Sequence, residues 1–104
     1  MDNQHKQIKG YRDLSQQEID LMNEIKVKGQ ELIDLADRLL GRCAQQFNDT
    51  FNASRAATSD DSTERSEYER LINANPTQWA LDGKNDVQVG VMKLVRAVAQ
   101  PTAC

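Results

Sequence analysis

The chain has 104 residues, a net charge of -3 and 28% charged residues, which favours one small acidic domain and argues against DNA binding, since DNA-binding domains usually present a basic face. No apolar run approaches the ~20 residues of a membrane span, and no apolar signal core opens the sequence, so we expect no membrane contact. Two Phe, two Tyr and one Trp supply little material for a core, and we expect self-association to complete it.

Residues 1–14 form a polar arm with a cluster of positive charge. Lys6, Lys9 and Arg12 lie within seven residues, and Tyr11 lies among them. The tyrosine ring offers a flat face on which a nucleobase can stack, a contact worth roughly 1–3 kcal/mol per base in single-strand binders. The alternative is a surface tyrosine among solvated charges, and the residues alone leave both interpretations open.

A long helix is predicted over residues 15–47, where no proline occurs. Ser15 and Glu18 fit a capping box, in which each side chain bonds to the backbone N–H of the other residue. Lys26 interrupts an apolar stripe, and a lysine in that place favours an anionic partner, whereas Lys28 faces another side of the helix. A seam with spacings of three and four is expected to be buried: Met22, Ile25, Gly29, Leu32, Ala36, Leu39 and Cys43.

Residues 48–62 are rich in Asn, Asp, Ser and Thr and lose the apolar spacing, so we expect a loop there. A short second helix is predicted over residues 63–74. Ser62, or a residue just before it, is suited to cap this helix because its hydroxyl can accept a hydrogen bond from a free N–H group of the first turn.

A third helix is predicted over residues 76–99, with Asn75 as its N-cap, Pro76 in its first position and Pro101 just beyond its end. Trp79 is expected to anchor a buried face of this helix. Two glycines on that face each cost about 1 kcal/mol relative to alanine, which close approach of another backbone would explain. The predicted face consists of Trp79, Gly83, Val87, Gly90 or Val91, Leu94 and Val98.

The expected fold class is therefore all-α. We expect residues 1–104 to form one domain, an antiparallel helical hairpin with a long first helix and a broken return arm, assembled into a homo-oligomer.

No arrangement of residues predicts catalysis, a metal site or a cofactor. The single histidine, His5, lies in the polar arm, and no serine lies in a nucleophile motif. Cys43 and Cys104 predict neither a disulfide framework nor a zinc site, and Cys43 suits a small buried hydrophobe. A reducing cytosol is the simplest compartment, and we expect a non-enzymatic protein.

Two stretches resemble a known family and together cover roughly a third of the chain: IKGYRDLSQQEIDLMNEIK, residues 8–26, and DVQVGVMKLVRAVAQPT, residues 86–102. They are similar to the phage anti-CBASS cyclic-nucleotide sponges. The resemblance implies a phage-encoded protein in the cytoplasm of the infected bacterial host. It would bind cyclic dinucleotides such as cyclic GMP-AMP without cleaving them, and so keep CBASS effectors inactive.

The resemblance also implies a hexamer of helical hairpins with ligand pockets between protomers. In the family a tyrosine and a lysine hold the cyclic dinucleotide, and the matching residues here are Tyr11 and Lys26. Arg12, Lys9 and Lys28 are further candidates for ligand contact because of their charge. Cyclic trinucleotides use a separate pocket in the family, and since Lys28 and residues 78–84 depart from its pattern, trinucleotide binding stays open.

Two other functions are compatible with the residues. A coiled-coil adaptor or structural protein would use the helical seam to bind another protein. An RNA or single-strand binder would use the basic arm, although the acidic net charge counts against it.

Overall fold

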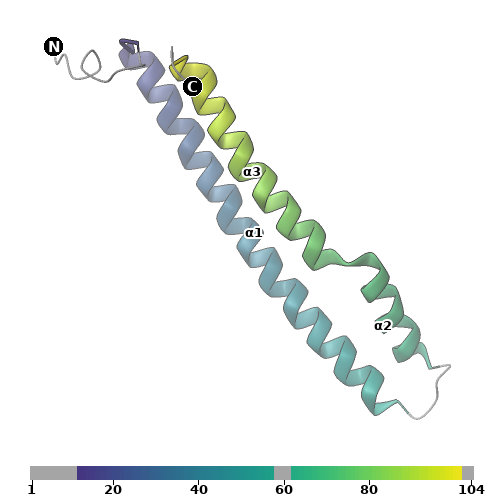
Figure 1. Ribbon diagram of the computed structural model, residues 1–104. Coiled ribbons are helices and arrows are strands. Elements are labelled where there is room, and N and C mark those ends of the chain that lie inside the picture. Colours follow the sequence, from purple (N-terminus) through teal and green to yellow (C-terminus); the bar gives the residue numbers. More distant parts are fainter. Residues whose placement is uncertain (1–11, 58–61, 102–104) are drawn as a thin grey trace. The chain divides into compact units, whose positions relative to one another are not determined.

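The computed structural model of the protein describes residues 12–57 and 62–101. Three α-helices account for most of them: α1 (Gln16–Ala56), α2 (Thr63–Ala74) and α3 (Pro76–Ala99) (Figure 1). No β-strand occurs in these two ranges. The all-α fold class predicted from the sequence is thereby confirmed.

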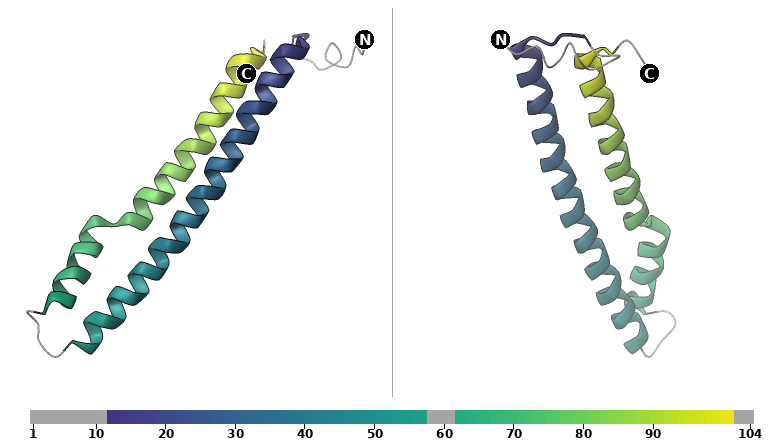
Figure 2. Two further views of the ribbon diagram at one scale, coloured as in Figure 1. Left: turned by 180° about the vertical axis from the view of Figure 1, so that it is seen from behind. Right: turned by 60° about the vertical axis from the view of Figure 1, so that its left-hand side comes forward.

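The chain divides into two compact units. The first unit consists of Met1–Ile33 and Asp86–Cys104, and the second unit consists of Asp34–Asn85. In the first unit, the start of α1 lies beside the end of α3; in the second, the end of α1 lies beside α2 (Figures 1 and 2). Each unit thus pairs a stretch of α1 with a returning stretch of chain, which is the antiparallel pairing of a helical hairpin.

Close contact between the two helices of the first unit is made at Gly29, which is buried on α1. A Cβ atom added there would overlap the Cγ2 atom of Val91 on α3. Ala99, at the end of α3, is 6% exposed. Glycine at position 29 lets the two helices approach each other closely, because it has no side chain to hold them apart.

Aromatic contacts between α1 and α2 and an ion pair between α1 and α3 hold the second unit together. Phe47 and Phe51 of α1 are stacked with ring centroids 6.3 Å apart, and Tyr68 of α2 lies against both rings at 5.8 and 5.6 Å. The Lys84 ammonium on α3 lies 2.6 Å from the Asp37 carboxylate on α1. These contacts join all three helices within the unit.

Two of the predicted helix starts are confirmed in detail. Ser15 Oγ accepts a hydrogen bond from the Glu18 N–H at 3.2 Å, and Glu18 Oε1 accepts one from the Ser15 N–H at 2.9 Å, which completes the capping box. Ser62 caps α2 by accepting from the Arg65 N–H at 3.1 Å. α2 and α3 span the residues expected of them.

Asn75 has two roles. It lies at the predicted N-cap position of α3, where its carbonyl accepts a hydrogen bond from the Trp79 N–H at 3.4 Å. It adopts a left-handed conformation, with φ of 49°, and ends α2 by donating its N–H to the Leu71 carbonyl. Gln100 ends α3 in the same way, with φ of 49° and its N–H bonded to the Arg96 carbonyl. A proline follows each of these residues, consistent with its frequent place just beyond a helix end.

The predicted loop over residues 48–62 is wrong for its first nine residues, because α1 continues to Ala56. Phe51 lies one turn beyond Phe47 and packs on Tyr68, and the Arg55 guanidinium lies over the Phe51 ring at 5.6 Å. Ser54 is 5% exposed. Packing of this face therefore outweighs the weak helix propensity of the Asn, Asp, Ser and Thr residues.

The predicted buried seams are also corrected. On α1, Leu32 and Leu39 are exposed, and their neighbours Ile33 and Leu40 are the half-buried residues. On α3, Trp79 is 72% exposed and so does not anchor a core within the protomer. Leu94 is likewise exposed. The apolar surface of each helix is wider than the partner helix covers, so periodicity alone could not choose between the two edges.

Candidate ligand-binding site

Arg12 lies just before α1 and joins the two helices of the first unit. Its Nη1 and Nη2 atoms donate to the two Glu18 carboxylate oxygens, and Nη2 also donates to the Val98 carbonyl at 2.9 Å. The Val98 carbonyl belongs to the last turn of α3, where helical carbonyls lack partners within the helix. Arg12 therefore connects the first turn of α1 to the C-terminal end of α3.

The same contacts perturb the acidity of Glu18. Its hydrogen bond from Arg12, and then that from the Ser15 N–H, lower the pKa of the Glu18 carboxyl to about 2. Both donors favour the charged form. The carboxylate thus remains ionised at physiological pH and holds Arg12 and Ser15 together.

Lys26 and Lys28 are both exposed on α1. Neither makes a hydrogen bond or ion pair with another residue of the described ranges. Because successive helical residues are ~100° apart, the two side chains leave the helix about 200° apart. Lys26 follows the half-buried Ile25 and Lys28 precedes the buried Gly29, so the two side chains leave α1 on opposite sides of its buried face. A small anion in contact with one ammonium would not reach the other on the same protomer.

Tyr11 and Lys9 lie outside the described residues, as does His5. Of the five predicted ligand-binding residues, three are therefore placed, and they are not brought together. Arg12 is engaged by protein acceptors, and its Nε atom is buried with no hydrogen-bond partner in the described part of the chain. The pairing of Arg12 with Glu18 was not expected from the sequence, although the capping box already marked Glu18 as a residue with a fixed position.

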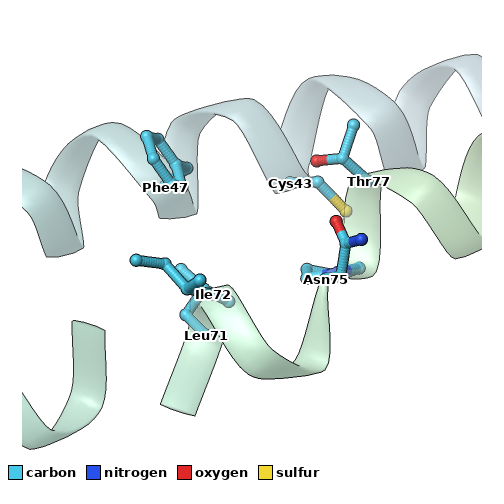
Figure 3. A pocket seen from close by; sticks show the side chains of 7 residues that line it. Cys43, Phe47, Leu71, Ile72, Asn75 and Thr77 are labelled. Atoms are coloured by element: carbon cyan, nitrogen blue, oxygen red, sulfur yellow. The ribbon is translucent and has the colours of Figure 1, made fainter. Parts of the chain in front are cut away.

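A small pocket lies in the second unit between α1 and α2 (Figure 3). Its volume is about 140 Å³, well below the roughly 300 Å³ at which ligand pockets begin. The Asn75 side chain points toward the Cys43 sulfur, and apolar side chains of α1 and α2 together with the first residues of α3 complete the lining. The lining residues are Cys43, Phe47, Leu71, Ile72, Asn75, Pro76 and Thr77. This pocket is too small for a cyclic dinucleotide.

A larger hollow of about 330 Å³ lies in the same unit, between the end of α1 and the start of α2. Asp49, Glu64 and Glu67 contribute carboxylates to its lining. The Arg70 guanidinium, which donates to Glu67, lowers the pKa of that carboxyl. A phosphate-bearing ligand would be repelled by these negative charges, so this hollow does not suit a nucleotide either.

Within residues 12–57 and 62–101, no group of His, Cys, Asp and Glu side chains is arranged to hold a metal ion. No helix in these ranges combines the length and the apolar character needed to cross a membrane.

The antiparallel helix pairing defines a small helical protein, and Lys26 and Lys28 on α1 are exposed with no partner among the described residues. No family model matches the chain. A protein of Pseudomonas phage JBD67 named Anti-CBASS protein 2 is 44% identical to it over 108 residues, covering the whole of both chains. The chain belongs to the family of this phage protein, as its two matching stretches indicated.

Proposed function

We propose that the chain binds cyclic oligonucleotide second messengers, sequesters them without cleavage and so blocks CBASS immunity in the cytoplasm of the infected bacterial host. The observation that carries the proposal is full-length similarity to Anti-CBASS protein 2, at 44% identity. Tyr11 and Lys26 are the residues through which we propose that a cyclic dinucleotide is held.

The chemistry of Tyr11 and Lys26 suits this ligand. A cyclic dinucleotide carries two bases and two phosphates in a compact ring. Tyr11 can stack on a base, and Lys26 has an exposed ammonium with no carboxylate partner in the described residues, which can pair with a phosphate. A sequestering protein needs tight binding; a Kd near ~1 nM corresponds to about -12 kcal/mol.

We further propose that the protein is a homo-oligomer, a hexamer by resemblance to its family, with ligand pockets between protomers. Cys43, Leu71 and Ala99 are the buried apolar residues of the described ranges, against thirteen exposed large hydrophobic side chains. A protomer with so little interior needs further burial. A pocket shared by two copies would supply two sets of Tyr11 and Lys26 for the two halves of the ligand.

A thermal-shift panel of the full chain with cyclic dinucleotides, cyclic trinucleotides, linear dinucleotides and oligonucleotides tests the proposal. We expect cyclic GMP-AMP to raise Tm and linear dinucleotides not to. Chromatography of the ligand recovered after denaturation should return it intact. No shift with any cyclic nucleotide would contradict the proposal. The measurement with cyclic trinucleotides decides whether the protein binds that second class of ligand.

A coiled-coil adaptor is the second candidate function. The observation that favours it is a row of exposed leucines on α1: Leu21, Leu32, Leu35 and Leu39. A heterologous helix could pack along such a row. This alternative predicts no response to any cyclic nucleotide in the same panel.

A further inference from the structure

We propose that Met92 of α3 contacts a nucleobase of the cyclic dinucleotide whose phosphate is held by Lys26 of α1. The inference rests on the proposed function, in which Lys26 is the phosphate contact. It adds to the candidate site a residue of the other helix, one that neither charge nor family resemblance indicated.

The contact between Gly29 and Val91 fixes how α1 and α3 face each other in the first unit. A Cβ atom at Gly29 would overlap the Val91 side chain, so these two residues mark the line along which the helices meet. The two helices run antiparallel within the unit (Figure 1). Viewed from the start of α1, successive residues therefore turn clockwise along α1 and anticlockwise along α3, by about 100° per residue.

These rotations bring Lys26 and Met92 to the same flank of the first unit. Lys26 precedes Gly29 by three residues, so its side chain leaves α1 about 60° clockwise of the contact line. Met92 follows Val91 by one residue and leaves α3 about 100° anticlockwise of that line, which on the facing helix is the same side. Both residues are displaced toward the start of α1, and their Cα atoms differ by only ~3 Å along the helix axis.

Met92 is strongly exposed on this flank. Its exposed fraction is 69%, second only to Trp79 among the large hydrophobic residues of the described ranges. Lys26 is also exposed, and it makes no hydrogen bond or ion pair with the described residues. The flank thus presents an ammonium free for an anion beside a thioether free for an apolar surface.

This pair of side chains matches the chemistry of a cyclic dinucleotide, which carries phosphates and bases in one compact ring. Lys26 can pair with a phosphate as a point charge. The Met92 sulfur is polarizable and makes favourable contacts with aromatic rings, and its unbranched side chain has three rotatable bonds with which to reach a base. Because every base has such a ring face, we expect the contact to add affinity without selecting one base over another.

Methyl NMR of the full chain tests the contact directly. The chain contains three methionines, Met1, Met22 and Met92, so selective methyl labelling gives three signals that Met22→Leu and Met92→Leu assign. We expect cyclic GMP-AMP to move the Met92 signal upfield through the ring current of the base, in step with the occupancy measured by calorimetry. Met22 is half-buried on α1 and serves as the internal reference. Binding in calorimetry with an unmoved Met92 signal would overturn the inference and leave the proposed function standing.

The Kd of variants tests whether the contact contributes to binding. We expect Met92→Ala to bind cyclic GMP-AMP about fivefold more weakly and Met92→Leu to stay within about twofold of wild type. Val89→Ala is the matched control, because Val89 is an exposed residue of the same helix two positions from Val91 and so faces away from α1. The salt dependence of binding should be that of wild type in all three variants, since none removes a charge.

Two results in the variants would overturn the inference. One is an unchanged Kd in Met92→Ala. The other is a loss in Leu94→Ala without a loss in Met92→Ala, because Leu94 follows Val91 by three residues and lies on the opposite flank. If wild type gives neither heat nor a moved methyl signal with any cyclic nucleotide, the proposed function fails and the contact with it.

Discussion

Gly29 of α1 and Val91 of α3 meet so closely that a single added methyl group at Gly29 would overlap the Val91 side chain. Valine is branched at Cβ and has few rotamers with which to move aside. Gly41 and Gly90, also within helices, have open space where a Cβ would stand. Gly29 is therefore a packing requirement of the first unit, and it lies one turn beyond Lys26.

Gly29→Ala is expected to destabilise the protein by about 1–2 kcal/mol. Overpacking costs about 1–3 kcal/mol, and the higher helix propensity of alanine returns up to about 1 kcal/mol. Gly41→Ala is the matched control and should stabilise by about 0.5–1 kcal/mol, because nothing lies within 4 Å of its new methyl group. Denaturant unfolding at one protein concentration measures both. Equal stabilisation by the two substitutions would show that the Gly29 contact is loose.

Local signals predicted the helix ends well. The Ser15–Glu18 box and the Ser62 cap need only residues three apart, and the structure contains both sets of bonds. Asn75 lies at the N-cap position of α3 as predicted, but its second role, ending α2 in the left-handed conformation that asparagine tolerates, was not predicted. Such signals depend on chemistry within one turn, which a sequence displays directly.

Structural features that depend on a partner distant in the sequence were less well predicted. The part of α1 that contains Phe51 packs on Tyr68, which lies seventeen residues later in the sequence. Trp79 has the spacing of a core residue, but the protomer leaves it 72% exposed. The link from Arg12 to Val98 joins residues 86 positions apart. At the candidate site, family resemblance suggested Lys26 as a ligand contact, which stays a prediction, whereas the bond partners of Arg12 became known only from the fold.

Stability should depend on pH through Glu18. Its pKa is lowered from 4.5 to about 2 by the Arg12 and Ser15 donors, so between these values the unfolded chain binds more protons than the folded one. The stabilisation is thus complete above about pH 4.5 and is lost as pH falls through about 2.

Thermal unfolding of wild type and Glu18→Gln between pH 2 and pH 6 measures this dependence. We expect wild type to lose its advantage over Glu18→Gln as the pH falls through that window. Ser62→Ala is the control, since loss of the hydroxyl that caps α2, in the other unit, should cost about 1 kcal/mol at each pH. A constant difference between wild type and Glu18→Gln across the whole range would contradict the assignment.

The face of α3 that contains the half-buried Gly90 and the exposed Leu94 is the place to test assembly. Leu94 is 56% exposed one turn further on, and a side chain at Gly90 would meet nothing within the protomer. A helix face with glycine beside an exposed leucine permits close approach of a second copy. We expect Gly90→Leu to reduce the oligomer mass in light scattering while the helical CD spectrum is retained.

Gly41→Leu is the matched control for assembly, because Gly41 also faces open space, and its effect on oligomer mass should be small. An unchanged mass for Gly90→Leu would place the contacts between copies elsewhere. The fluorescence of Trp79 gives a second readout. Its emission should shift to longer wavelength in any variant that separates protomers, if its 72% exposed ring is covered in the oligomer.

Lys26 and Lys28 should differ in their effect on cyclic dinucleotide binding, although only two residues separate them. Lys26→Ala removes the proposed charge-assisted contact to a phosphate, a loss of about 1.5–3 kcal/mol or roughly 10- to 100-fold in Kd. Lys28→Ala changes the net charge equally but on another side of α1, so we expect less than about a threefold change. Calorimetric titration with cyclic GMP-AMP measures both, and Tyr11→Ala should resemble Lys26→Ala. Equal losses in the two lysine variants would mean that a second copy brings Lys28 to the same ligand, because one protomer presents the two ammonium groups about 200° apart.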